Sequence, residues 1–196
     1  MAATLLDDLF KAVFEDNAEE VHRLINAGVK VKAYPQHGNT VLRMACQAKA
    51  LRAMRVLLEH GVDPNERITY SSSVDGRVEE NYTPLMYAST AATINLLVSF
   101  GADVNAVSAT GLSALLRFAF FGEDEAVEAL LKHGADTTLR QKFRKWKTPL
   151  TALEISREQL SYMEQMLADS PNPADAKITI QRYRRTLALL SGATQS

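Results

Sequence analysis

Cysteine is almost absent from this chain of 196 residues, whose single thiol belongs to Cys46. One thiol cannot form an internal disulfide or supply a thiolate cage for zinc. Metal-binding pairs are missing too, because no His-x-x-x-His or Cys-x-x-Cys pattern occurs. We therefore expect no metal and no cofactor, and a lone reduced thiol suits a cytoplasmic protein.

Long apolar runs and a basic leader are missing as well. No apolar stretch approaches the roughly 18 residues that a membrane helix requires. Asp7 and Asp8 interrupt the apolar N-terminal run, and no basic segment precedes them. The sequence therefore predicts neither a secretory signal nor a membrane span.

The chain has no large excess of charge of one sign and has few of the residues that interrupt helices. The 22 basic and 23 acidic side chains give a net charge of -1, so no global field attracts nucleic acid or anionic lipid. Nucleic acid is therefore not the expected partner unless a local patch binds it. The 9 Gly and 6 Pro are fewer than usual, which favours helices. We expect a single domain and a monomer.

Four of the nine glycines mark an internal repeat. They stand at positions 28, 61, 101 and 134, with spacings of 33, 40 and 33, and each closely follows a pair of Leu, Ile or Val residues. A glycine in this position is typical of the left-handed residue that ends a helix. The sequence therefore predicts that a helix ends just before each of these glycines.

A second phrase marks the start of another helix in each unit. It combines a Thr or Ser with apolar residues and a small residue one turn later, and it occupies 38–46, 81–89, 111–119 and, in truncated form, 148–153. A Thr or Ser hydroxyl accepts an orphan backbone N–H at a helix start, and Pro fits the first turn. The expected N-caps are Thr40, Thr83, Ser113 and Thr148.

The complete unit is a loop, a capped short helix, a turn, a second helix ended by Gly, and an Asp-x-Asn loop, and it resembles the ankyrin repeat. The resemblance covers about residues 5–169. It implies an all-α solenoid of helix–turn–helix units with β-turn or hairpin loops and a C-terminal capping helix. The chain would be one ankyrin-repeat domain, 1–196, with units at about 5–33, 34–66, 79–106, 107–139 and 144–169, and with the capping helix over 172–191.

Two departures from the regular unit should change its local structure. The third unit has three residues fewer between Ala88 and Gly101 than the second has between Ala45 and Gly61, so its first helix or its inter-helix turn must be short. The polar segment 66–80 lengthens the preceding loop by ten residues. We predict that this segment is an extended or mobile finger.

Residues that could carry chemistry have structural explanations. Cys46 falls at a small-residue position of a first helix, where we expect a buried thiol rather than a nucleophile. His60 and His133 precede helix-ending glycines, where a cation interacts favourably with the helix dipole. No Gly-x-Ser-x-Gly motif or phosphate-binding glycine loop occurs. We therefore do not expect an enzyme.

The resemblance implies that partners bind on the concave face that first helices and loops form in ankyrin stacks. Carried over position by position, with the aromatic residues of one basic loop added, the candidate binding residues are Tyr34, His37, Gln47, Tyr82, Phe120, Phe121, Phe143, Arg144, Lys145 and Trp146. Phe120 and Phe121 are adjacent, so they point about 100° apart on a helix. Either one of them is exposed, or packing between repeats buries both.

These residues predict a non-enzymatic module that binds another protein of unknown identity, as an inhibitor, an immunity-type factor or an adaptor. The alternative is an anion-binding module. Residues 140–147 hold five cations interleaved with Phe143 and Trp146, a composition that can bind single-stranded nucleic acid, phosphate or acidic lipid. A solvated loop or an acidic protein partner would explain the same residues.

Overall fold

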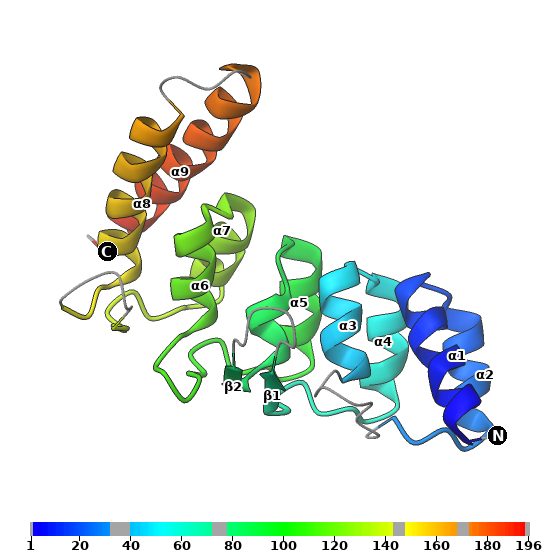
Figure 1. Cartoon of the computed structure of the whole chain (residues 1–196). Helices are drawn as coiled ribbons and strands as arrows, with labels where there is room; N and C mark the ends of the chain where they lie inside the picture. The colour runs from blue at the N-terminus through cyan, green and yellow to red at the C-terminus, as the bar shows by residue number, and fades with distance from the viewer. Residues whose placement is uncertain (1, 32–39, 72–77, 143–147, 168–172, 195–196) are drawn as a thin grey trace. The chain divides into compact units, whose positions relative to one another are not determined.

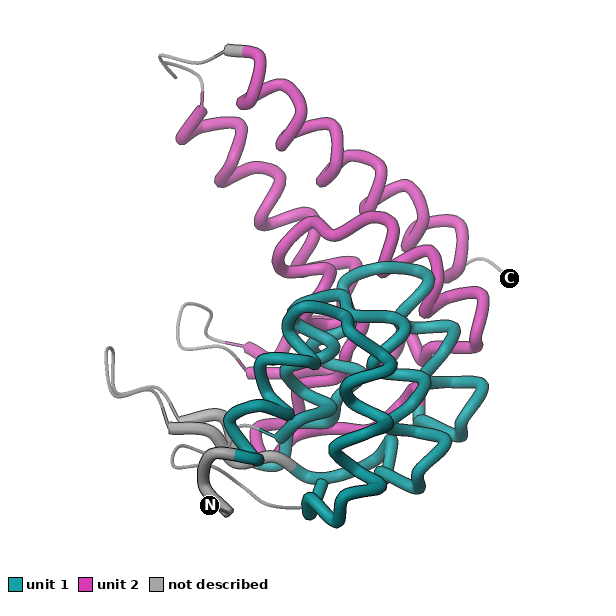
Figure 2. The backbone as a smooth tube through the Cα atoms, turned by 90° about the vertical axis from the view of Figure 1, so that its right-hand side faces the viewer, with its two compact units in different colours: residues 1–103 teal, residues 104–196 magenta. Residues whose placement is uncertain are grey.

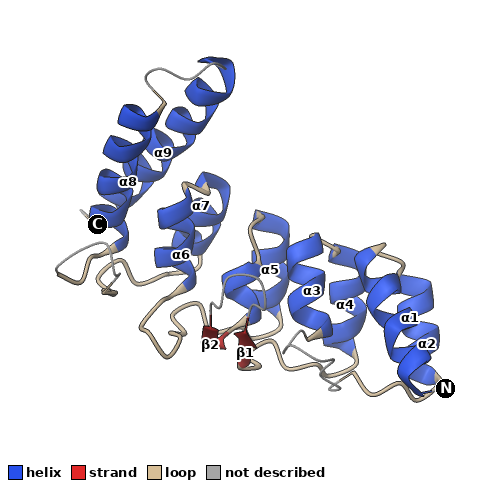
Figure 3. Ribbon diagram, in the orientation of Figure 1, coloured by secondary structure: helices blue, strands red, loops and turns tan. Residues whose placement is uncertain are grey.

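The computed structural model describes residues 2–31, 40–71, 78–142, 148–167 and 173–194 (Figure 1). Helices predominate in these residues, and the only sheet among them is a two-stranded antiparallel hairpin (Figure 3). The chain divides into two compact units, Met1–Asp103 and Val104–Ser196, which Figure 2 shows in different colours. The all-α repeat fold is confirmed, whereas the single domain stays a prediction.

The first unit contains three successive helix pairs and the hairpin. Its elements are α1 (Ala2–Phe14), α2 (Ala18–Asn26), α3 (Val41–Ala48), α4 (Leu51–Glu59), β1 (Ile68–Ser71), β2 (Val78–Tyr82), the 3-10 helix η1 (Pro84–Tyr87) and α5 (Ala91–Ser99). First helices pack on first helices, because α1 contacts α3 and α3 contacts η1. Second helices do the same, α2 with α4 and α4 with α5. The apolar core between the two rows includes Leu9, Leu24, Leu42, Leu57 and Leu85.

The second unit contains one regular helix pair and a longer pair that follows it. Its elements are α6 (Ala114–Phe121), α7 (Asp124–Lys132), α8 (Ala152–Met166) and α9 (Pro173–Ala193). Helix α9 packs on α8, α7 and α6, and it buries Tyr183, Thr186 and Leu190 against them. It therefore covers the other helices of its unit, as the predicted C-terminal capping helix should.

Most helix starts and stops follow the local sequence. The Thr40 hydroxyl accepts the backbone N–H of Arg43 at 3.1 Å, and Ser113 caps α6 in the same way. Gly61 has a φ of 77°, which brings the N–H of the next residue within 3.1 Å of a carbonyl in the last turn of α4. The same left-handed conformation recurs at Gly28, Gly101 and Gly134.

Helix α8 starts three residues later than the sequence indicates. Its N-cap is Thr151, so the prediction that Thr148 caps this helix is wrong. The Thr151 hydroxyl accepts the N–H of Glu154 at 3.3 Å, and the Glu154 carboxylate accepts the N–H of Thr151 at 2.8 Å. This reciprocal pair satisfies two orphan donors at once, which explains why the helix begins here rather than at Thr148.

The third helix pair is short, as predicted, because its first helix η1 has only four residues and a 3-10 geometry. The insert before it is extended where the structure describes it. Strand β1 pairs with β2, which places Tyr70 opposite Glu79 and Ser71 opposite Val78. The insert therefore forms an antiparallel pair of strands that precedes η1 in the sequence. Residues 72–77, between the two strands, lie outside the described part of the chain.

Asparagine side chains link neighbouring repeats at the base of the loops. In the first unit, Asn65 Oδ1 accepts the N–H of Asp103 at 2.7 Å, and its Nδ2 donates to the Gly101 carbonyl at 2.8 Å. In the second unit, Asn105 Oδ1 accepts the N–H of Asp136 at 2.7 Å, and its Nδ2 donates to the Gly134 carbonyl at 3.4 Å. The Asn of the Asp-x-Asn motif is therefore a cross-link between repeats.

The turn between the two helices of a repeat places one residue in the left-handed region. Asp16, Lys49 and Gly122 occupy this position, with φ values of 52°, 57° and 64°. The Asp16 carboxylate also accepts the backbone N–H of Ala53, the third residue of α4, at 2.8 Å. Helix α4 has Ala50 as its N-cap and lacks a side-chain cap of its own. The first repeat thus caps the second helix of the next repeat.

Candidate functional site

An aromatic and cationic cluster lies at the C-terminal end of α6. Phe120 is half-buried, whereas Phe121 keeps 48% of its surface exposed. The two rings meet edge to face, with their centroids 5.2 Å apart. The Arg117 guanidinium lies over the Phe121 ring, 5.4 Å from its centroid. The sequence left open whether one of these two rings is exposed or both are buried between repeats, and the structure leaves Phe121 exposed.

Helix α9 holds the end of α6 in place. The Tyr183 hydroxyl donates to the Phe120 carbonyl at 3.0 Å, and burial raises the pKa of Tyr183, so the hydroxyl stays a donor at neutral pH. The Tyr183 ring also lies directly against Gly122, where an added Cβ would be 2.8 Å from the ring. The backbone that presents Phe121 is thus fixed by a neighbouring helix.

Two arginines of α9 pair with the acidic start of α7. Arg182 forms an ion pair with Glu123, and Arg185 lies 3.2 Å from an oxygen of Asp124 and 2.7 Å from one of Glu128. These side chains are partly exposed, and such pairs contribute about 0–1 kcal/mol each. They join residues far apart in the chain, which is why sequence reasoning did not find them.

In the first unit, the structure describes two of the predicted binding residues. Gln47 is exposed at the end of α3. Tyr82 is half-buried at the end of β2, with its ring centroid 6.0 Å from that of Tyr87. The guanidinium of Arg43, which is 5% exposed, lies 4.5 Å from the centroid of the same Tyr87 ring. The structure therefore places Tyr82 beside Tyr87, whose ring in turn contacts Arg43, and neither Tyr87 nor Arg43 was a predicted binding residue.

The remaining predicted binding residues lie outside the described part of the chain. They are Tyr34, His37, Phe143, Arg144, Lys145 and Trp146. The basic segment is described as far as Lys142, which is exposed. Arg140 donates to the Pro149 carbonyl at 3.0 Å and pairs with Glu154 at 3.1 Å. One of the five cations is therefore engaged within the protein.

The corrected start of α8 changes which residues precede its cap. Arg144 and Lys145 were predicted to bind the partner because they lie four and three residues before Thr148, the expected N-cap. Counted back from Thr151, the same positions are 147 and 148. The loop before α8 is therefore longer than predicted, and Arg144 and Lys145 stay predictions.

Phe14 is a candidate residue that sequence reasoning missed. It stands three residues before the N-cap of α2, just as Gln47 and Phe120 stand three residues before the N-caps of α4 and α7. It keeps 70% of its surface exposed. The signal was available in the sequence, because counting back from the start of each second helix finds all three residues.

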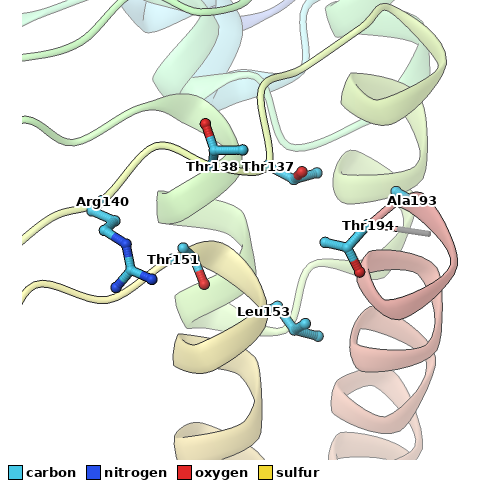
Figure 4. Close-up of a pocket in the computed structure, with 7 residues that line it drawn as sticks. All are labelled: Thr137, Thr138, Arg140, Thr151, Leu153, Ala193 and Thr194. Atoms are coloured by element: carbon cyan, nitrogen blue, oxygen red, sulfur yellow. The ribbon is translucent and has the colours of Figure 1, made fainter. Parts of the chain in front are cut away.

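The hollow drawn in Figure 4 shows no catalytic arrangement. It has a volume of about 310 Å³ and is lined by Thr137, Thr138, Arg140, Thr151, Leu153, Ala193 and Thr194. The Thr138 hydroxyl donates to Asp136 at 2.7 Å, and the Thr151 hydroxyl donates to Glu154 at 3.0 Å. These hydroxyls are engaged by the protein's own carboxylates, and the lining includes no His, Cys or Lys that could activate a nucleophile.

Two further findings concern metal ions and membranes. Cys46 is fully buried, as expected, and its burial raises the pKa of the thiol, so it is neither a nucleophile nor a thiolate ligand at neutral pH. Across the residues that the structure describes, no three His, Cys, Asp or Glu side chains are grouped to hold a metal ion. No helix in that same part of the chain has both the length and the apolar character to cross a membrane.

Comparison with known proteins points to one family. The sequence model of the family described as Ankyrin repeat matches residues 37–68 and 80–109. NF-kappa-B inhibitor alpha of Gallus gallus is 33% identical over 65% of this chain and 40% of its own length. Neurogenic locus notch homolog protein 2 of Homo sapiens is 32% identical over 63% of this chain and 5% of its own length.

A fungal relative matches more of the chain. Ankyrin repeat domain-containing protein SAT10 of Stachybotrys chartarum is 28% identical over 90% of this chain, although over only 9% of its own length. This chain therefore corresponds to less than half of each of these relatives. Ankyrin repeats are protein–protein interaction modules and are generally non-enzymatic. The repeated helix pairs, the family match and these relatives show that the chain is an ankyrin repeat protein.

Proposed function

We propose that this chain is a non-enzymatic module that recognises one partner protein through its first helices and its loops. Phe121 is the centre of the contact in the second unit, with Phe120 and Arg117 beside it. Gln47 and Tyr82 are the proposed contact residues of the first unit, taken by itself. Further contacts proposed from the sequence are Tyr34, His37, Phe143, Arg144, Lys145 and Trp146.

The exposed Phe121 ring carries this proposal. It is 48% exposed at the end of a helix, with an arginine over its face and a second aromatic ring at its side. Aromatic residues and arginines dominate the binding energy of protein interfaces, and truncation of such a residue often costs about 2 kcal/mol or more. Because α9 fixes the end of α6, little conformational entropy is lost when a partner covers the ring.

The regulatory role that fits this module is to occupy its partner, as an inhibitor, an immunity-type factor or an adaptor. One relative is named as an inhibitor of NF-kappa-B, and this name supports the inhibitory form of the proposal. The expected location is the cytoplasm, where the lone thiol of Cys46 stays reduced.

The test begins with affinity capture from native lysate, which identifies the partner, followed by calorimetry with the purified partner. Phe121→Ala should weaken binding about 30-fold, the equivalent of about 2 kcal/mol. The matched control is Ile178→Ala, because Ile178 is a 57% exposed apolar residue of α9. It should bind like wild type.

Two results would contradict the proposal. One is an equal affinity of wild type and Phe121→Ala for the captured protein. The other is a steep loss of affinity between low and physiological salt for wild type, which would favour an anion-binding module that uses the basic loop.

A further inference from the structure

Two histidine rings from neighbouring repeats meet on the second helices of the first unit. His22 is exposed in α2, and His60 is half-buried at the end of α4, which packs on α2. The centroids of the two imidazole rings are 5.0 Å apart, and the ring planes are inclined by 83°. The two residues are far apart in the sequence, so the pair forms only when the first repeat packs on the second. No short motif encodes it, which is why the sequence indicated no metal.

Each of these rings is engaged through its Nδ1 atom. His60 Nδ1 donates to the Val56 carbonyl at 2.8 Å, so the neutral ring carries its proton there and has Nε2 as an acceptor. His22 Nδ1 lies 2.9 Å from the side-chain amide nitrogen of Asn26. The same amide, turned over, presents its oxygen to a protonated Nδ1. A histidine that binds a metal through one ring nitrogen usually donates the N–H of the other to such an acceptor.

The distance between the two rings is that of two imidazoles on one metal ion. Histidine nitrogens bind transition metals at about 2.0–2.1 Å, which puts the ion about 3.2 Å from each ring centre. At the tetrahedral angle the two ring centres are then about 5.2 Å apart. The observed separation is 5.0 Å. The steep angle between the ring planes does not oppose this arrangement, because a ring can adopt any rotation about its own metal–nitrogen bond.

We propose that His22 and His60 bind one divalent transition-metal ion through their Nε2 atoms, and that this ion cross-links the first two repeats. The protein supplies two ligands, and water completes the coordination at this partly exposed position. Imidazole suits Zn²⁺, Ni²⁺ and Cu²⁺, whereas Mg²⁺ and Ca²⁺ prefer oxygen ligands. The site is independent of the proposed function, because it lies on second helices and the Phe121 cluster lies on a first helix.

The charges next to the pair permit a bound cation. Glu19 is exposed and stands one turn before His22 on α2, so its carboxylate adds negative charge on the same side of the helix. Arg23 follows His22 directly, but its guanidinium lies 2.6 Å from a carboxylate oxygen of Glu20. The positive charge closest in the sequence is therefore compensated within α2.

Ni²⁺ alone is the probe, titrated into the whole chain without a histidine tag and followed by isothermal titration calorimetry. We expect one Ni²⁺ to bind per chain, Cu²⁺ to bind more tightly than Ni²⁺, and Mg²⁺ not to bind. His22→Ala and His60→Phe should each weaken Ni²⁺ binding about tenfold or more, because each removes one of two protein ligands. Phe at position 60 keeps an aromatic ring before the glycine, as Phe100 does before Gly101.

Matched controls use the two other histidines of the chain. His133 precedes Gly134 as His60 precedes Gly61, so His133→Ala tests whether this position alone binds the ion. His133→Ala and His37→Ala should both bind Ni²⁺ like wild type. Because the ion binds the folded chain, Ni²⁺ should also raise the urea midpoint of wild type and not that of His60→Phe. Circular dichroism should show that every variant is folded.

Three results would overturn this proposal. Wild type does not bind Ni²⁺; His22→Ala or His60→Phe binds Ni²⁺ as tightly as wild type; or Mg²⁺ binds as tightly as Ni²⁺, which would indicate a carboxylate site. Phe121→Ala should bind Ni²⁺ like wild type. A failure of the proposed function, an unchanged partner affinity in Phe121→Ala, is therefore distinguishable from a failure of the metal site.

Discussion

Replacing Asn65 by Ala should destabilise the first unit at the junction between two repeats. The substitution removes the 2.7 Å bond from the Asp103 N–H and the 2.8 Å bond to the Gly101 carbonyl. A hydrogen bond contributes about 0.5–1.5 kcal/mol net, so two of them give a loss of about 1–3 kcal/mol. Asn65 is only half-buried, and water can replace part of the loss, which places the expected value near 1.5 kcal/mol.

Urea unfolding followed by far-UV circular dichroism is the measurement. For a slope of about 3 kcal/mol per molar urea, the expected loss lowers the midpoint by about 0.5 M. Because repeats are stabilised by contacts with their nearest neighbours, the transition should also become broader. Gln47→Ala, at an exposed helical position of the same unit, is the control and should stay within about 0.5 kcal/mol of wild type. An Asn65→Ala midpoint equal to wild type would refute the cross-link.

Three further outcomes follow from single contacts. Asp16→Gly keeps a residue suited to positive φ but removes the cap of α4, so it should lose about 1 kcal/mol in urea unfolding, whereas Asp16→Asn keeps an acceptor and should lose less. Gly122→Ala places a Cβ 2.8 Å from the Tyr183 ring at a φ of 64°, so calorimetry should show a lower melting temperature for it than for Gly192→Ala, where the added Cβ meets nothing. Burial raises the pKa of the Glu66 carboxyl in the folded protein. The stabilisation that Glu66 contributes is therefore fully present below the unfolded pKa of about 4.3 and is lost as pH rises through the folded pKa. In urea unfolding from pH 4 to 7, Glu66→Gln should reduce this loss of unfolding free energy with rising pH.

The repeat fold could be predicted from the sequence because its signals are local. A glycine after a helix and a hydroxyl before one act within a few residues, and Gly61 and Thr40 behave as predicted. The start of α8 was missed because a Thr-Pro pair and a Thr-x-x-Glu pair stand three residues apart and both resemble a helix start. The reciprocal bonds of Thr151 and Glu154 decide between them.

The candidate site was less predictable because it depends on contacts between distant segments. The adjacency of Phe120 and Phe121 indicated that one ring could be exposed, but the sequence did not identify which. The bond from Tyr183 to the Phe120 carbonyl and the pairing of Arg182 with Glu123 join residues about 60 positions apart. No short pattern in the sequence encodes such pairs, because they form only when α9 packs on its neighbours.

The asparagine cross-link has a consequence for the evolution of this chain. In the following repeat, the Asn65 side chain forms its hydrogen bonds with main-chain atoms, the Gly101 carbonyl and the Asp103 N–H, and not with side chains. A duplicated or exchanged repeat with a matching apolar core could therefore form this link whatever side chains it carries at the bonded positions, provided that its backbone turns in the same place. The hairpin of β1 and β2 lies between the two ends of this link, so the loop could lengthen without breaking the bond between neighbours.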